Sequence, residues 1–164
     1  MQEYLKELSM IYIFSAFYAE AKNIIDHYGL KKEKSPETVR FDVFANDSIR
    51  LVITGVGEIN AAAAVSNIGG AYGIAPDDEI LNVGCGAGFG NETCLGSIFL
   101  GNKLTEQMTG RTFYPDMLMK TNLMECEIVT VTRVLNEGSD SVVYDMEAAA
   151  VYQAAAFFVG PHRM

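Results

Sequence analysis

The sequence has 164 residues, of which 49% are hydrophobic, and it carries a formal net charge of −9 at pH 7. This size and apolar content predict one domain, residues 1–164, with one sizeable core. The negative charge disfavours nucleic acids and anionic membrane surfaces as partners, because both would be repelled. The lysine cluster Lys31, Lys32 and Lys34 is interrupted by Glu33, which is typical of a solvated loop.

The first ten residues, MQEYLKELSM, include acidic residues and no long apolar stretch, so no export signal is expected. Residues 11–16, IYIFSA, predict a buried strand, and residues 19–30 have apolar positions at helical spacing. The next two predicted strands, 39–45 and 49–55, flank the turn pair Asn46-Asp47 and predict a hairpin.

The rest of the chain continues the alternation of helices and strands. The sequence predicts a helix over 60–73, a strand and glycine-rich loop over 79–90, strands over 95–104 and 126–135, and an alanine-rich helix over 145–158. Several of the strands are apolar on both faces. The pattern therefore predicts an α/β fold, with a mixed, largely parallel β-sheet flanked by helices. No stretch is apolar for long enough to predict a membrane span.

Neither the cysteines nor the histidines indicate a metal site. Cys85, Cys94 and Cys126 form neither a CxxC pair nor an even set, so disulfides and structural zinc are not expected. This fits a reducing cytoplasm. His27 and His162 lie far apart in the sequence without partners at ligand spacing. The sequence predicts no metal and no other cofactor.

Two glycine-rich turns follow predicted strands. In TGVGEINAAAAVSN, residues 54–67, Asn60 stands where a dinucleotide fingerprint would need its third glycine, so a tight strand-to-helix turn is expected. NVGCGAGFG, residues 82–90, lacks the Lys-Ser/Thr of a phosphate-binding P-loop and suits backbone contact with an uncharged ligand. Cys85 in this loop has no basic neighbour, which favours inert packing over reactivity.

A third motif, VVYDMEAAAVYQAAAFF, covers residues 142–158. Glu147 could simply interact with the helix dipole, and Asp145 could be the N-cap. The functional alternative is that Asp-Met-Glu joins a strand to a helix at the sheet edge that also carries the glycine loops. Met146 and Glu147 would then face a ligand.

Taken in order, ITGVGEINAAAAVSN, LNVGCGAG and YDMEAAAVYQAA resemble the nucleoside phosphorylase and nucleosidase family, which includes the methylthioadenosine/S-adenosylhomocysteine nucleosidases. The resemblance covers nearly the whole chain, and MEAAA is its most diagnostic part. It implies that Met146 packs beneath a ribose and that Glu147 accepts hydrogen bonds from the ribose hydroxyls. A carboxylate suits a vicinal diol because it offers several acceptor sites and no donor.

The same resemblance assigns further residues. Glu20 matches the glutamate that orients the attacking water, although by itself it reads as an exposed acid at the front of a helix. The residues that would line the pocket around the substrate are Phe17, Val56 near the 5′ substituent, Cys85, Gly86 and Ala87 beside the base, and Val134 and Leu135. Val134 stands where the family often stacks an aromatic ring on the purine.

Family phosphorylases carry a GDPxR-type phosphate loop near the N-terminus, whereas this chain has Ser15-Ala16-Phe17-Tyr18 and no arginine there. Water is therefore the expected acceptor. Family members also supply a general acid from a Ser-Asp pair on a strand after the MEAAA helix, and no matching pair follows Phe158. The expectation is a fold that lacks the final strand and helix, impaired catalysis, an exposed sheet edge, and a homo-oligomer, with a dimer favoured.

Three functions remain open from the sequence. The first is hydrolysis of the N-glycosidic bond of a purine nucleoside with Glu20 as base. The second is nucleoside binding without catalysis, and the third is phosphorolysis. All three imply a small-molecule nucleoside as the partner.

Overall fold

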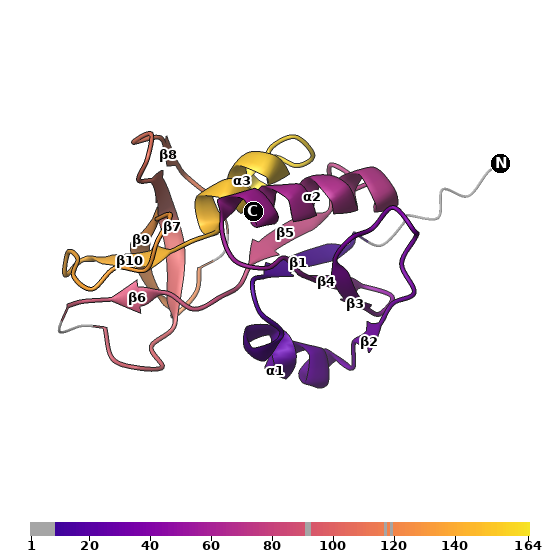
Figure 1. The fold of residues 1–164 in the computed structure, drawn as a ribbon, viewed down its shortest axis with the longest axis horizontal. Coiled ribbons are helices and arrows are strands. Elements are labelled where there is room, and N and C mark those ends of the chain that lie inside the picture. Colours follow the sequence, from indigo (N-terminus) through magenta and orange to yellow (C-terminus); the bar gives the residue numbers. More distant parts are fainter. Residues whose placement is uncertain (1–8, 91–92, 117, 119) are drawn as a thin grey trace.

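The computed structural model describes residues 9–90, 93–116, 118 and 120–164 (Figure 1). Residues 1–8 lie outside the described residues. The prediction that the first ten residues are not an export signal falls mostly on this segment. Within the described ranges, no helix is both long and apolar enough to cross a membrane.

Two groups of strands build the structure. The first half of the chain forms β1 (Ile11–Ser15), α1 (Tyr18–Tyr28), β2 (Lys31–Lys32), β3 (Asp42–Ala45), β4 (Ile49–Ile53), α2 (Glu58–Tyr72) and β5 (Glu79–Asn82). The second half forms β6 (Ala87–Gly88), β7 (Phe99–Glu106), β8 (Thr112–Phe113), β9 (Met124–Thr130), β10 (Val142–Asp145), α3 (Ala148–Ala155) and a 3₁₀ turn, η1 (Pro161–Arg163).

The strands form two five-stranded sheets, in the orders β2-β3-β4-β1-β5 and β6-β10-β9-β7-β8. In the first sheet β4, β1 and β5 run parallel, and in the second β10, β9 and β7 do. The pairs β2–β3, β3–β4, β6–β10 and β7–β8 are antiparallel. The predicted mixed α/β fold is confirmed, with its strands divided between two sheets.

Helices cover both faces of the first sheet. Helices α2 and α3 lie side by side on one face, and α1 lies on the other (Figure 1). Alternation along β1 explains this: Tyr12 and Phe14 pack with α2 and α3, whereas Ile13 packs with α1. β1 is thus buried on both faces, as its apolar run predicts.

The ends of several predicted elements differ from the observed ones, and two of these differences affect the site. The strand predicted over 126–135 ends at Thr130, and Val134 and Leu135 lie in the loop that follows. The helix predicted over 145–158 spans only Ala148–Ala155. It begins late because Asp145 still pairs with Thr130 in the β9–β10 ladder, so its backbone is extended.

Candidate active site

A cavity of about 190 Å³ opens where β1, β4 and β10 lead into the segments that follow them. Nine of the ten residues predicted from the sequence line it: Phe17, Glu20, Val56, Cys85, Ala87, Val134, Leu135, Met146 and Glu147. These residues come from five separate segments of the chain. Parallel strands explain the convergence, because their carboxyl ends meet at one sheet edge.

Gly86 is the tenth predicted residue. It lies between Cys85 and Ala87 in the chain but is not part of the cavity lining. It packs against β10 so closely that an added Cβ would lie 2.4 Å from Val143 Cγ1 and 3.0 Å from the Tyr144 carbonyl oxygen. Its role here is therefore close backbone approach, which holds the glycine loop against the second sheet.

Glu20 lies in the first turn of α1, and both of its carboxylate oxygens accept hydrogen bonds. Oε2 accepts from the Phe17 backbone N–H at 3.2 Å and from Ser15 Oγ at 3.3 Å. Oε1 accepts from the Cys85 backbone N–H at 3.1 Å. Three donors from three segments fix the carboxylate, so it is held at the cavity wall and is not a freely solvated helix-front acid.

Glu147 reaches across the cavity edge to the start of α2. Its Oε1 accepts a hydrogen bond from the Gly57 backbone N–H at 2.7 Å. The backbone N–H of Met146 also lies close enough to this carboxylate to lower its pKa. Gly57 adopts φ 96° and Gly55 φ 78°, a region that favours glycine, so the predicted tight turn is confirmed. The turn aims a backbone donor at Glu147 and places Val56 in the cavity wall.

Asp145 links the two sides of the connection between β10 and α3. Its Oδ1 accepts from Thr130 Oγ1 at 2.6 Å, and its Oδ2 accepts from the backbone N–H of Glu147 at 3.0 Å and from that of Ala148. Thr130 Oγ1 accepts in turn from the Ala149 N–H at 2.9 Å. Asp145 therefore satisfies the first donors of α3, as a capping residue does.

Burial shifts the ionisation of several cavity groups. It raises the pKa of Glu147, an effect opposed by the Gly57 N–H and reinforced by the negative charges of Asp145 and Glu20. Burial also raises the pKa of Asp145, against the hydrogen bonds from Thr130 and from the helix N–H groups. Burial and the nearby Glu20 raise the pKa of the Cys85 thiol. Cys85 therefore stays protonated near neutral pH, which agrees with the inert alternative.

The described lining of this cavity combines carboxylates with apolar side chains. Its charged residues are Glu20, Asp145 and Glu147, and it contains no lysine, arginine or histidine. Phe17 and Val134 are 53% and 80% exposed, which places them at its mouth. Such a wall suits a neutral ligand that donates hydrogen bonds at one end and is apolar at the other.

Sequence reasoning missed several residues that build this site. Ala16, Val131 and Tyr144 line the cavity, and Ser15, Gly57 and Thr130 hold its carboxylates. Ser15 and Thr130 are each 1% exposed. A polar residue at the end of the apolar strand β1 is the signal that could have found Ser15, because a buried hydroxyl needs a partner. Strand β9 also contains Glu125 and Glu127, so Thr130 does not stand out in the same way.

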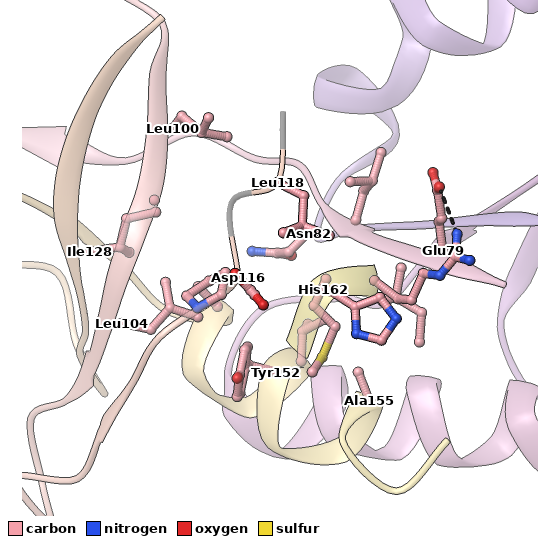
Figure 2. Close-up of a pocket in the computed structure, with 18 of the residues that line it drawn as sticks. Glu79, Asn82, Leu100, Leu104, Asp116, Leu118, Ile128, Tyr152, Ala155 and His162 are labelled. Atoms are coloured by element: carbon pink, nitrogen blue, oxygen red, sulfur yellow. Dashed lines mark hydrogen bonds and ion pairs between the residues drawn. The ribbon is translucent and has the colours of Figure 1, made fainter. Parts of the chain in front are cut away.

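A second and larger cavity, of about 500 Å³, lies between the two sheets. Figure 2 shows Leu100, Leu104 and Ile128 of the second sheet on one side of it and Glu79 of β5 on the other. Glu79 is paired with Arg163 at 3.3 Å. None of the ten predicted site residues lines this cavity.

The fold is similar to that of a class of solved structures, the 5′-methylthioadenosine/S-adenosylhomocysteine nucleosidases. One is the enzyme from Neisseria meningitidis in complex with methylthio-immucillin-A, with a TM-score of 0.73 and 18% sequence identity over 92% of this chain and 80% of that one. Another is the Helicobacter pylori enzyme, with a TM-score of 0.76 and 11% identity over 93% and 81%.

The Colwellia psychrerythraea nucleosidase, in complex with adenine, has a TM-score of 0.73 and 18% identity over 93% of this chain and 79% of that one. No protein-family model matches the sequence, and a search of curated proteins found no match. The solved structures thus confirm the fold that the resemblance to the nucleoside phosphorylase and nucleosidase family implies.

Proposed function

We propose that this protein binds a purine nucleoside in the 190 Å³ cavity and hydrolyses its N-glycosidic bond slowly. The observation that carries the proposal is the pairing of two fixed carboxylates, Glu20 and Glu147, on one small cavity. Structural likeness supports it, because the solved nucleosidases of this fold include complexes with methylthio-immucillin-A and adenine. The residue roles are those that the family resemblance implies, and the contacts of Glu20 and Glu147 support them.

Glu147 is the ribose ligand in this proposal. One of its oxygens is occupied by the Gly57 N–H, and the other is available to a hydroxyl donor. Charge-assisted hydrogen bonds of this kind are stronger than neutral ones. Met146, from the same connection, contributes an apolar surface under the sugar, and Val56 contributes one toward the 5′ substituent.

Glu20 is the residue that orients and activates water. Its carboxylate is held by three donors, and a carboxylate has enough lone pairs to accept one more hydrogen bond from a water molecule. Loss of a proton from that water, as it attacks the anomeric carbon, is assisted by the carboxylate. Phe17, Cys85, Ala87, Val134 and Leu135 surround the side on which the base would lie.

We expect slow turnover because the described cavity lining offers no free acid to protonate the departing base. The departing base needs a proton, and Asp145, the third acid in the described lining, already accepts hydrogen bonds on both oxygens. Without a positioned acid, such a reaction loses about 10² to 10⁴ in rate. Phosphorolysis is disfavoured because the described lining holds no cationic side chain for phosphate.

The test is to incubate the chain separately with methylthioadenosine and with inosine and to measure free base by chromatography. Base release in phosphate-free buffer supports hydrolysis, and release that requires phosphate identifies a phosphorylase. Calorimetric binding without any release supports the second candidate, a non-catalytic nucleoside-binding protein. No binding and no release would refute the proposal.

The proposal extends to a homodimer in a reducing cytoplasm. Large apolar side chains are exposed at and beside the cavity mouth: Phe17, Val56, Ile59 and Val134, with Ile59 87% exposed. A second copy that covers them would remove apolar surface from water. Light scattering coupled to size exclusion gives the mass, and a monomer at all concentrations would contradict this part.

A further inference from the structure

Asp145 occupies a junction between the second sheet and α3. It is the last residue of β10, in register with Thr130 at the end of β9. Thr130 is 1% exposed, and its hydroxyl donates to Asp145 Oδ1 while accepting from the Ala149 N–H. The hydroxyl group of Thr130 therefore links the end of β9 to the Asp145 carboxylate and to the start of α3.

The other carboxylate oxygen of Asp145, Oδ2, binds the backbone between β10 and α3. Oδ2 accepts from the Glu147 and Ala148 N–H groups, and Glu147 adopts φ −135° and ψ −34°. This conformation differs from that of a regular helix, so Glu147 precedes α3 and is not part of its first turn. From there its side chain crosses to the Gly57 N–H, 90 positions away in sequence.

We propose that Asp145, held by Thr130, is a positioning residue that fixes the Met146–Glu147 backbone and aims Glu147 at the sugar hydroxyls of the ligand. This inference rests on the proposed function. An ordinary N-cap would stabilise α3 and nothing more. The difference is that Asp145 contacts the backbone of the very residue whose side chain lines the cavity.

The charged groups around Glu147 set its ionisation. Asp145 and Glu20 both act on Glu147 through their negative charge, and Asp145 acts in the same way on Glu58, which lies beside Glu106. The opposing influence on Glu147 comes from the N–H groups of Gly57 and Met146. The described cavity lining contributes no cation. Neutralising Asp145 removes a negative charge from beside Glu147, so the pKa of Glu147 is expected to fall.

The ligand must meet an ionised Glu147, because a protonated carboxyl loses acceptor capacity. Glu147 has a raised pKa, so nucleoside affinity is present at neutral pH and is lost as pH falls through a value above the ordinary pKa of glutamate, 4.5. Asp145→Asn keeps an oxygen for the helix N–H groups but removes the charge. The pH at which affinity is lost then moves downward.

The experiment measures methylthioadenosine binding by calorimetry across pH in the Glu20→Gln chain, which prevents turnover, with and without Asp145→Asn. Asp145→Ala in the same chain is expected to weaken binding at neutral pH about tenfold, since hydrogen bonds to a charged group are lost. Thr130→Val should weaken binding and Thr130→Ser should retain it, because only serine keeps the hydroxyl. Circular dichroism checks that each variant is folded.

A second readout needs no ligand. Carboxyl carbon-13 NMR follows the titration of Glu147 in the wild-type chain and in Asp145→Asn, and a lower midpoint in the variant supports the inference. If every Asp145 variant bound nucleoside with unchanged affinity and the titration of Glu147 were also unchanged, Asp145 would be only a helix cap. Absence of binding by the wild-type and Glu20→Gln chains alike would overturn the proposed function itself.

Discussion

One cavity lies beside α3 and another at its start, and they differ in both size and chemistry. The larger, about 500 Å³, is walled by Val151, Tyr152 and Ala155 of the helix, together with apolar residues of both sheets. The smaller, about 190 Å³, lies at the helix start and is walled by three carboxylates. Volume alone would favour the larger cavity as the binding site. Converging carboxylates, two of them with raised pKa values, favour the smaller one.

The difference has a structural origin. Each carboxylate of the small cavity accepts hydrogen bonds from backbone N–H groups, which come from the loop after β5, the turn before α2 and the start of α3. In the large cavity, the carboxylate of Glu79 is paired with Arg163 and points along the wall (Figure 2). Chemistry is therefore expected where backbone donors hold acids in place, and the comparison can be tested at both cavities.

The largest effect is expected from Glu20→Gln. The amide cannot take a proton from water, so base release from methylthioadenosine should fall about 10²- to 10⁴-fold. Chromatographic assay of free adenine measures this. Thermal unfolding at an unchanged temperature would show that the loss is chemical, and full release by the variant would remove Glu20 from the mechanism.

Glu147→Ala should weaken nucleoside binding by about 1.5–3 kcal/mol, the range for a hydrogen bond to a charged partner. The variant also leaves the Gly57 N–H without its acceptor. Calorimetric titration with methylthioadenosine gives the affinity. Glu147→Gln is the matched control that keeps one acceptor oxygen and should lose less. Equal affinity in all three chains would mean that the ligand does not use this side chain.

Gly57→Ala is expected to cost about 1–2 kcal/mol of stability, because an L-residue is strained at φ 96°. The strain should also displace the donor that holds Glu147. Gly70→Ala is the matched control, since Gly70 lies inside α2 with open space around an added Cβ. That change should stabilise the helix by up to about 1 kcal/mol. Chemical denaturation compares them, and equal stability would show that the turn tolerates a side chain.

The smallest effect on ligand binding is expected from Tyr152→Phe in the large cavity. Its hydroxyl donates to the Tyr114 carbonyl at 3.1 Å, so stability should drop by about 1 kcal/mol while nucleoside affinity stays unchanged. Anilinonaphthalene sulfonate, a dye with a large apolar ring system, should bind this cavity and remain bound when nucleoside is added. Displacement of the dye by nucleoside would reverse the assignment of the two cavities.

Several parts of the fold were predictable because their signals are local. The apolar run of β1, the Asn46-Asp47 turn between β3 and β4, and the alanine-rich pattern of α2 each reflect short-range periodicity or turn chemistry. The predicted grouping of Glu20, the glycine loops and Glu147 came from a resemblance spread over the whole chain. The structure brings them together as expected, while their roles in binding and catalysis stay predictions.

The division of the strands into two sheets was not predictable, because pairing partners lie far apart in sequence. The start of α3 was misplaced for the same reason: the Asp145–Thr130 ladder pair outweighs the helical preference of the sequence around it. Ser15 and Thr130 gave no strong sequence signal, since their importance comes from the carboxylates that fold against them.

The sequence by itself determined the α/β class and the tight glycine turn at Gly55 and Gly57, because these depend on residue type and local pattern. The acids at positions 20 and 147 were singled out by a resemblance that extends over the whole chain. Only the tertiary structure decided which oxygens of those acids are occupied and which remain available. That distinction depends on hydrogen bonds between segments 65 to 90 residues apart, as in Glu20 with Cys85 and Glu147 with Gly57. Burial, and with it the raised pKa of Glu147, likewise exists only once the two sheets and α3 have closed around the site.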